Sequence, residues 1–233
     1  MKTTLEFTNQ NNINSSSLER LSTEERFAFL HQRYGNQLVA STSFGIQSSI
    51  MLHLISNHAP QTPVIFVDTG YLFPETYQYA ETLTNLLGIN LKVYTPQYTA
   101  ARIKALWGDV WEQGAEEEQR YAQITKLDPM NQALDELNAH TWISGIRRSQ
   151  SRSRINKPFI EQKNTIQKAY PILDWTDQQI KDYQDRFNLP VHPLQKKGYV
   201  TSGDVHSTKS LLDVASAEET RFNGGKYECG LHI

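Results

Sequence analysis

The sequence predicts an α/β protein with an open, mostly parallel, twisted sheet and helices on both of its faces. Short apolar runs alternate with helix-length segments along the chain, which is the pattern of a parallel sheet with crossover helices. The 233 residues suffice for one domain with a core of its own. Hydrophobic residues make up 38% of the chain and charged residues 21%, as in an ordinary globular protein.

The N-terminal part is expected to be a disordered tail followed by a helix. Residues 1–17 are rich in Asn, Gln, Ser and Thr, and they hold too few apolar groups to offset the entropy of ordering them. The apolar residues that come next recur at roughly helical spacing and end before Gly35: Leu18, Leu21, Phe27 and Leu30.

Four strands and four further helices are predicted for the α/β domain that we place at residues 18–194. The expected strands span residues 37–41, 64–67, 91–94 and 141–144. The expected helices span residues 46–56, 74–87 and 112–138, and a last one from Thr176 to about Phe187. From residue 195 onward the chain holds five glycines and little periodicity, so we expect residues 195–233 to form a flexible loop and a mobile C-terminal arm.

Charge and cysteine content exclude several classes of protein. The net charge of −2 argues against a general nucleic-acid binder. The single cysteine, Cys229, excludes an internal disulfide, a four-cysteine zinc site and an iron–sulfur cluster held by four cysteines of one chain. No apolar run approaches the roughly 18 residues of a membrane span, and the N-terminus lacks a signal-peptide core. We therefore expect a cytoplasmic protein.

Two loops follow predicted strands at the edge of the sheet where ligands bind in open α/β folds. Residues 41–49 are rich in hydroxyl groups, contain one glycine and lead into a helix, which suits either an anion site or a Ser-rich helix cap. Residues 68–76 form either a turn in which Asp68 or Thr69 satisfies backbone donors or the second wall of a nucleotide-sized crevice. The residues alone leave both alternatives open.

Positive charge is concentrated just after the fourth predicted strand. Residues 146–168 hold seven Lys and Arg residues against one Glu, a local charge of +6 that leaves −8 for the rest of the chain. Guanidinium groups bind phosphate and sulfate oxygens in bidentate geometry. A polyanionic small ligand is therefore favoured over a solvated face or a nucleic acid.

Cys229 lies in a polar, glycine-flanked segment near the C-terminal end, where a buried structural cysteine is not expected. Lys226 and His232 stand three residues away on either side and can lower its pKa toward the thiolate. The cysteine is a candidate nucleophile, although an incidental free thiol is the alternative.

Six segments together resemble the sulfonucleotide reductases, and among them the thioredoxin-dependent phosphoadenylyl-sulfate (PAPS) reductases of assimilatory sulfate reduction. The segments are Ser-Phe-Gly-Ile-Gln-Ser at 43–48, Asp-Thr-Gly-Tyr-Leu-Phe-Pro-Glu-Thr at 68–76, Trp-Glu-Gln-Gly at 111–114, Pro-Met-Asn-Gln-Ala-Leu at 129–134, Gly-Ile-Arg-Arg-Ser-Gln-Ser-Arg-Ser-Arg at 145–154 and Glu-Cys-Gly-Leu-His at 228–232. The resemblance implies an adenine nucleotide alpha-hydrolase-like fold and a homodimer.

The resemblance also implies a mechanism. Cys229 would attack the sulfur of PAPS, form an S-sulfocysteine and release adenosine 3′,5′-bisphosphate, after which thioredoxin would free sulfite. A chain with one cysteine cannot resolve such an adduct by itself, so an external dithiol is needed. His232 would tune or position the cysteine. Other residues would bind the substrate by motif position: Ser41, Ser43, Gly45, Asp68, Gly70, Leu72, Lys126, Arg147, Arg148, Arg154 and Arg221.

Two further expectations concern the substrate and the cofactor. Related reductases that use adenylyl sulfate (APS) hold a [4Fe–4S] cluster, and the matching positions here read Tyr121-Ala122 and Asp204-Val205-His206-Ser207, so we expect no iron–sulfur cluster. An ATP pyrophosphatase-type ligase or adenylyltransferase would need a Ser-Gly-Gly-x-Asp-Ser loop, from which residues 43–48 depart. A nucleotide-binding or redox-sensing module without turnover is the other alternative.

Overall fold

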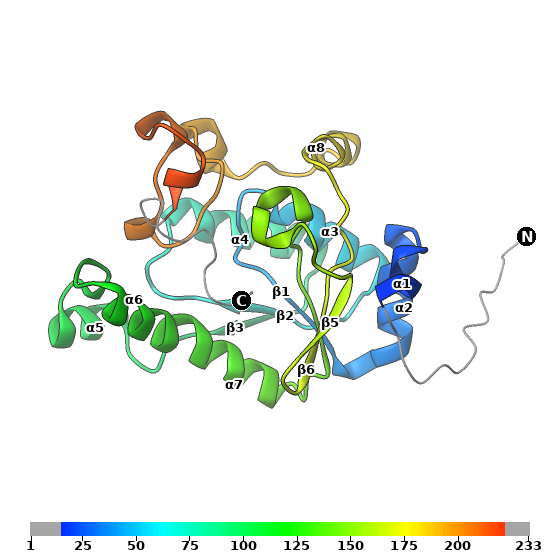
Figure 1. The fold of residues 1–233 in the computed structure, drawn as a ribbon, viewed down its shortest axis with the longest axis horizontal. Coiled ribbons are helices and arrows are strands. Elements are labelled where there is room, and N and C mark those ends of the chain that lie inside the picture. The colour runs from blue at the N-terminus through cyan, green and yellow to red at the C-terminus, as the bar shows by residue number, and fades with distance from the viewer. Residues whose placement is uncertain (1–14, 222–233) are drawn as a thin grey trace, which may run out of the picture.

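The computed structural model describes residues 15–221 and shows a six-stranded sheet with helices on both faces (Figure 1). The strand order is β3-β2-β1-β4-β6-β5. The strands are β1 (Leu38–Ser41), β2 (Val64–Val67), β3 (Leu91–Tyr94), β4 (Thr141–Ile143), β5 (Ile160–Lys163) and β6 (Ile166–Ala169). Neighbouring strands are parallel, except that β5 runs antiparallel to β6. The predicted fold class is confirmed.

The four predicted strands are confirmed within one residue, but β5 and β6 were not predicted. Their sequences, IEQK and IQKA, alternate too weakly between apolar and polar residues to indicate strands. They form a hairpin in which Asn164 takes the left-handed conformation, with a φ of 51°. Glu161 faces Lys168 across the pair. Part of the basic segment is therefore built into the sheet.

Each strand sends alternate side chains to opposite faces of the sheet. Leu38 and Ala40 of β1 join the larger core, which the helices α2, α3 and α4 cover. Val39, between them, joins a second core against α7. The helices are α1 (Ser15–Glu19), α2 (Thr23–Tyr34), α3 (Ser48–His58), α4 (Pro74–Leu87), α5 (Ala100–Trp107), α6 (Ala115–Ala122), α7 (Asp128–Glu136) and α8 (Asp177–Arg186).

The long helix expected at residues 112–138 is interrupted. A π-helical turn, Gln123–Leu127, lies between α6 and α7, and such turns are frequent at functional sites. The Thr125 hydroxyl donates to the Tyr121 carbonyl oxygen within this turn (2.7 Å). The π turn holds Lys126 in a buried position.

The first helix begins earlier than expected. Residues 15–17, which were predicted to belong to the tail, form the start of α1. The Ser15 hydroxyl accepts a hydrogen bond from the backbone N–H of Phe159 (2.8 Å), beside β5. This long-range contact explains why local composition alone placed the boundary too late.

Residues 193–221 form a chain of short 3₁₀ turns, not the flexible loop that we expected from residue 195. The turns are Pro193–Lys197, Val205–Ser207, Leu211–Asp213 and Glu218–Thr220. Polar side chains of the segment are buried, including Ser202, Asp204 and Thr208. A backbone bridge joins Asp204 to Leu72, and the Val205 N–H donates to the Tyr71 carbonyl oxygen (2.8 Å). The segment therefore packs on the loop after β2.

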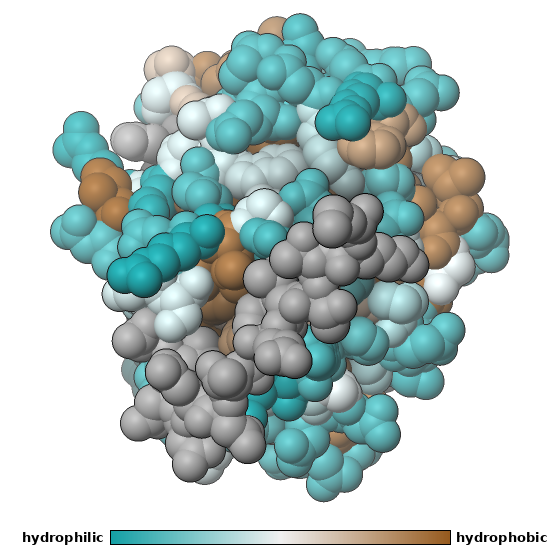
Figure 2. Space-filling model, turned by 90° about the vertical axis from the view of Figure 1, so that its right-hand side faces the viewer, coloured by the Kyte–Doolittle hydropathy of each residue, from teal (hydrophilic) through white to brown (hydrophobic). Residues whose placement is uncertain are grey.

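The face in Figure 2 is largely hydrophilic, with hydrophobic groups in separate small areas. Within residues 15–221, every helix is too short or too polar to cross a membrane.

Candidate active site

The loop after β1 lies at the carboxyl edge of the sheet and leads into α3. Phe44 has a φ of 47° and buries its ring against Phe66, with the ring centroids 5.0 Å apart. This anchor leaves Ser43 exposed. A Cβ atom added to Gly45 would lie 3.4 Å from the Ser43 Oγ and 3.8 Å from the Ser202 Oγ. The loop therefore runs beside the 3₁₀ segment, and a Cβ atom at this glycine would make ordinary contacts there.

Ser41, at the end of β1, has a structural partner. Its Oγ accepts a hydrogen bond from the Trp142 Nε1 of β4 (2.8 Å). This bond joins two neighbouring strands at the edge where the loops begin. The sequence motif gave no sign of this use of the hydroxyl group.

The loop after β2 is held by its own side chains. Asp68 Oδ1 accepts hydrogen bonds from the Gly70 N–H (2.9 Å) and the Tyr77 hydroxyl (2.7 Å), as expected for a turn-forming aspartate. Gly70 has a φ of 78°, and a Cβ atom there would lie 3.3 Å from the Ala100 Cβ. Leu72 is buried and is the partner of Asp204 in the backbone bridge. Both interpretations of this loop thus remain compatible with the geometry.

Two buried arginines follow β4. Arg147 donates to Asp177 Oδ1 (2.7 Å) and to Gln47 Oε1 (2.6 Å), so it ties the loop to the first turns of α8 and α3. Arg154 donates to Gln150 Oε1 (2.5 Å), which also accepts from the Arg147 N–H (3.0 Å). The N-cap residue of α3, Gln47, makes no capping bond of its own. The Ser48 and Ile50 N–H groups donate to the Gly45 and Gln47 carbonyl oxygens (3.0 and 3.4 Å), so it is the Arg147 charge and the helix dipole that meet at this helix end.

Other cations of the basic segment are used in packing. Arg148 Nη2 donates to the Lys157 carbonyl oxygen (2.9 Å), and its guanidinium lies over the Phe159 ring, 5.1 Å from the centroid. Lys157 Nζ donates to Glu161 (2.8 Å). Lys168 lies 4.5 Å from the centroid of the Trp142 ring. The number of charges in the segment could not show that these three residues stabilise the fold, whereas Arg147 and Arg154 lie in the loop at the candidate site.

Lys126 forms an ion pair inside the site. Its Nζ lies 2.6 Å from Asp204 Oδ2, and the Thr69 hydroxyl donates to Asp204 Oδ1 (2.5 Å). Burial alone would raise the pKa of Asp204, but the Lys126 ammonium and the Thr69 hydroxyl outweigh it and hold that pKa below its ordinary value. The Asp204 carboxylate is therefore charged at neutral pH although it is only 1% exposed.

Aromatic rings surround this ion pair. His206 stacks on Trp111 with 3.8 Å between ring centroids, and Tyr71 and Tyr121 meet His206 edge-on. Burial, opposed by the Asp204 charge and aided by Lys126 and Arg221, lowers the pKa of His206 to about 4, so its imidazole is neutral at pH 7. Residues 121–122 and 204–207, the positions at which the family resemblance led us to look for cluster ligands, lie side by side and hold aromatic groups and the Asp204 carboxylate.

Arg221 closes the described part of the site. It is buried, and its Nη1 donates to the Ser202 carbonyl oxygen (3.0 Å). A Cβ atom on Gly203 would lie 2.5 Å from Arg221 Nη1, so this glycine is required for the guanidinium to lie on the backbone. Cys229 and His232 lie outside the described residues.

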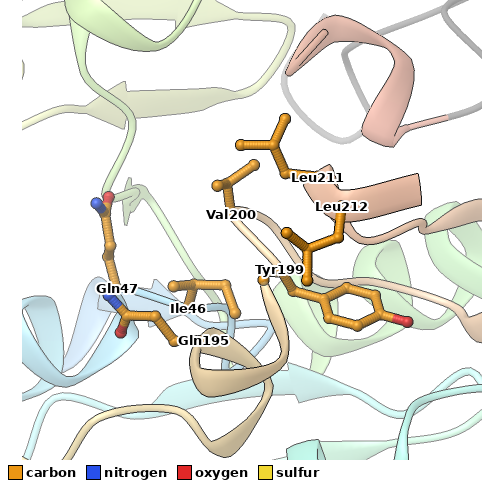
Figure 3. Close-up of a pocket in the computed structure, with 8 residues that line it drawn as sticks. Ile46, Gln47, Gln195, Tyr199, Val200, Leu211 and Leu212 are labelled. Atoms are coloured by element: carbon orange, nitrogen blue, oxygen red, sulfur yellow. The ribbon is translucent and has the colours of Figure 1, made fainter. Parts of the chain in front are cut away.

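A pocket of about 260 Å³ opens between the start of α3 and the 3₁₀ segment (Figure 3). Ile46 and Gln47 form one side, and Tyr199, Val200 and Leu212 belong to the opposite side. Gln47 also binds Arg147. A mainly apolar pocket that also has the polar side chains of Gln47 and Gln195 suits a ring system with polar groups.

The structure therefore brings most predicted site residues to one edge of the sheet. Ser43, Gly45, Asp68, Gly70, Arg147 and Arg154 lie in the loops after β1, β2 and β4, and Lys126 and Arg221 reach this edge from the π turn and the 3₁₀ segment. Sequence reasoning assigned no site role to Thr69, Gln150 or Asp204. The sequence did hold one sign for Asp204, because it is the one acidic residue in the stretch 195–212.

Comparisons with known proteins agree with this geometry. The family model described as the phosphoadenosine phosphosulfate reductase domain matches residues 37–210. A phosphoadenosine 5′-phosphosulfate reductase of Photobacterium profundum is 46% identical over 218 residues, covering 94% of this chain and 86% of that protein. One of Vibrio cholerae is 47% identical over 216 residues, covering 92% and 85%.

Solved structures support the same relationship. The phosphate complex of a PAPS reductase from Candida auris superposes with a TM-score of 0.74 at 28% identity, covering 84% of this chain and 94% of that one. An FMN adenylyltransferase from Candida glabrata gives a TM-score of 0.57 at 14% identity and covers 84% of this chain and 71% of that one. The second likeness concerns the fold alone.

Proposed function

Because the chain belongs to the phosphoadenosine phosphosulfate reductase family, we propose that it reduces PAPS to sulfite and adenosine 3′,5′-bisphosphate in sulfate assimilation, with reduced thioredoxin as the electron donor. The product nucleotide carries two phosphate groups, and the substrate carries a sulfo group in addition. Such a ligand needs several cations in one place, although the whole protein has a net charge of only −2.

One observation carries this proposal: four cationic side chains, each at most 8% exposed, gather at the carboxyl edge of the sheet. They are Lys126, Arg147, Arg154 and Arg221. Burying cations is costly unless anions or acceptors compensate them. Within the described residues, the ion pairs at this edge join Lys126 to Asp204 and Arg147 to Asp177. The gathering of four buried cations at one edge supports an anionic ligand there.

In the proposed reaction, the Cys229 thiolate attacks the sulfur atom of the sulfo group. The bond from sulfur to the bridging oxygen breaks, the nucleotide leaves as adenosine 3′,5′-bisphosphate, and Cys229 carries an S-sulfo group. Buried arginines stabilise the charge that develops on the departing phosphate. A thioredoxin thiolate then attacks the Cys229 sulfur and displaces sulfite, and the second thioredoxin thiol resolves the mixed disulfide.

The described geometry supports the binding part of this scheme. The positive end of the α3 dipole lies beside Arg147, and together they favour one anionic group. The pocket between Ile46 and Val200 has a size and lining that suit the nucleobase. The relative from Candida auris was solved with phosphate.

Reaction without an iron–sulfur cluster, a homodimer and a cytoplasmic location also remain proposals. The first rests on the single cysteine of the chain, since a [4Fe–4S] cluster needs several thiolate ligands. Among residues 15–221, no three His, Asp or Glu side chains gather to hold a metal ion.

The decisive experiment measures sulfite release with reduced thioredoxin, using PAPS and APS side by side. We expect sulfite release from PAPS only when thioredoxin is present; without it, one equivalent of adenosine 3′,5′-bisphosphate should be released and the sulfo group should stay on Cys229. Binding of adenosine 3′,5′-bisphosphate without any sulfite formation would indicate a binding module. ATP–pyrophosphate exchange would instead indicate an adenylyltransferase, which shares the fold.

A further inference from the structure

The buried Thr69–Asp204–Lys126 unit connects three segments that are distant in sequence. Thr69 lies in the loop after β2, Lys126 in the π turn and Asp204 in the 3₁₀ segment. Asp204 is only 1% exposed. Its Oδ1 accepts a hydrogen bond from the Thr69 hydroxyl, and its Oδ2 forms an ion pair with the Lys126 ammonium. A site built for a polyanion thus contains a buried anion, and this carboxylate needs an explanation.

We infer that Asp204 is a positioning residue that holds the Lys126 ammonium at the sheet edge in the orientation needed for turnover. This inference rests on the proposed function. Lysine has a flexible four-carbon stem, so an ammonium without a fixed partner samples many rotamers. Asp204 limits that freedom, and the Thr69 hydroxyl fixes the carboxylate in turn. The entropy cost of fixing the Lys126 side chain is therefore met when the protein folds, and it does not add to the activation free energy of the reaction.

The surroundings of the pair support a directional role. Lys126 Nζ also lies 5.5 Å from the centroid of the Tyr121 ring, so one side of the ammonium is covered by an aromatic face. Tyr121 contacts His206, which stacks on Trp111. Arg221 lies against Gly203, next to Asp204 in the chain. The Lys126 ammonium is therefore held between the Asp204 carboxylate and the Tyr121 ring.

The first test measures the position of Lys126 without any turnover. Wild type and Asp204→Asn are treated with an acylating reagent, and modification of Lys126 is quantified by peptide mass, with exposed Lys92 as the internal reference. We expect Lys126 to be protected in wild type and to react at least about tenfold faster in Asp204→Asn. Equal protection in both proteins would overturn the inference, whatever the enzyme's substrate is.

The second test separates positioning from folding. Removing Lys126 alone would leave a buried carboxylate unpaired and destabilise the protein, so the reference is the neutral pair Lys126→Met/Asp204→Asn. We expect kcat/KM for PAPS to fall at least about tenfold in Asp204→Asn and to the same level in the double variant. Thr69→Val, which removes only the hydroxyl, should give an intermediate value.

The outcomes distinguish this inference from the proposed function. Absence of PAPS turnover in wild type would refute the proposed function, while Lys126 acylation would still decide the inference. Asp204→Asn that keeps much more activity than the double variant would show that Lys126 works without Asp204. If both the activity and the melting temperature of the double variant returned to the wild-type values, the pair would serve folding alone. Either result would overturn the inference.

Discussion

The variant Arg148→Ala tests whether Arg148 binds the nucleotide or stabilises the fold. The concentration of Arg and Lys after β4 predicts a loss of nucleotide affinity with little change in stability. The structure leads to the opposite expectation, because the Arg148 guanidinium is bound to the Lys157 carbonyl oxygen and lies over Phe159. We therefore expect the variant to be less stable while its affinity for adenosine 3′,5′-bisphosphate stays within about threefold.

The magnitude follows from these two contacts. A hydrogen bond from a charged donor contributes about 1.5 kcal/mol at a half-buried site, and the cation–π contact adds about 0.5–1 kcal/mol. The free energy of unfolding should fall by about 2–2.5 kcal/mol, which lowers the melting temperature of a domain this size by about 4–10 °C. Urea denaturation and calorimetric binding of the nucleotide measure both quantities on one preparation.

Arg152→Ala is the matched control. Arg152 lies four residues further along and is exposed, so the substitution removes the same charge without the two contacts. Its melting temperature should stay within about 2 °C of wild type, since exposed substitutions change stability by about 0.5 kcal/mol or less. An unchanged melting temperature of Arg148→Ala combined with a large loss of affinity would refute the structural interpretation and assign Arg148 to the ligand.

Three further predictions concern the nucleophile, the substrate and the response to acid. Cys229→Ser should abolish sulfite formation while nucleotide binding is kept, and wild type treated with PAPS alone should carry one sulfo group on Cys229, as seen by peptide mass; an adduct elsewhere would contradict the mechanism. PAPS should exceed APS in kcat/KM by at least about 10²-fold, or roughly 2.7 kcal/mol, because the 3′-phosphate offers further negative charge to the buried cations of the site. Similar values with the same thioredoxin would count against this prediction. Burial, opposed by the Glu75 charge, lowers the pKa of His192 to about 4, so folding favours the neutral imidazole. The resulting contribution to the free energy of unfolding, about 3 kcal/mol, is fully present above pH 6.5 and is lost as the pH falls toward 4. His192→Asn keeps an acceptor for the Leu194 N–H, which the imidazole Nδ1 accepts in wild type (3.1 Å); urea denaturation at pH 7 and pH 4.5 should show a smaller loss in this variant, and identical losses would exclude His192 as a source.

The local pattern of the chain was enough to predict the strands β1 to β4 and the helix α4. Each of these elements has its own apolar spacing and end signals, such as Pro74 at the first turn of α4 and Gly88 with a φ of 60° at its end. The same pattern placed the loops after β1, β2 and β4 at one edge, because parallel strands end on the same side of the sheet. Sequence motifs then indicated Arg147, Arg154 and Lys126 as candidate site residues.

Only the tertiary structure decided what each charged group does. The hairpin β5–β6, the order in the 3₁₀ segment and the buried pair of Lys126 with Asp204 depend on contacts between distant residues; the bond from Thr69 to Asp204 spans 135 positions. Arg147 and Arg148 are neighbours in sequence, yet they have different partners. Arg147 donates to Gln47 at the candidate site, whereas Arg148 donates to the Lys157 carbonyl oxygen and packs within the fold. Sequence spacing records how many charges a segment holds. Burial and partner geometry decide which of them face a ligand, because the energy of a charge depends on its surroundings.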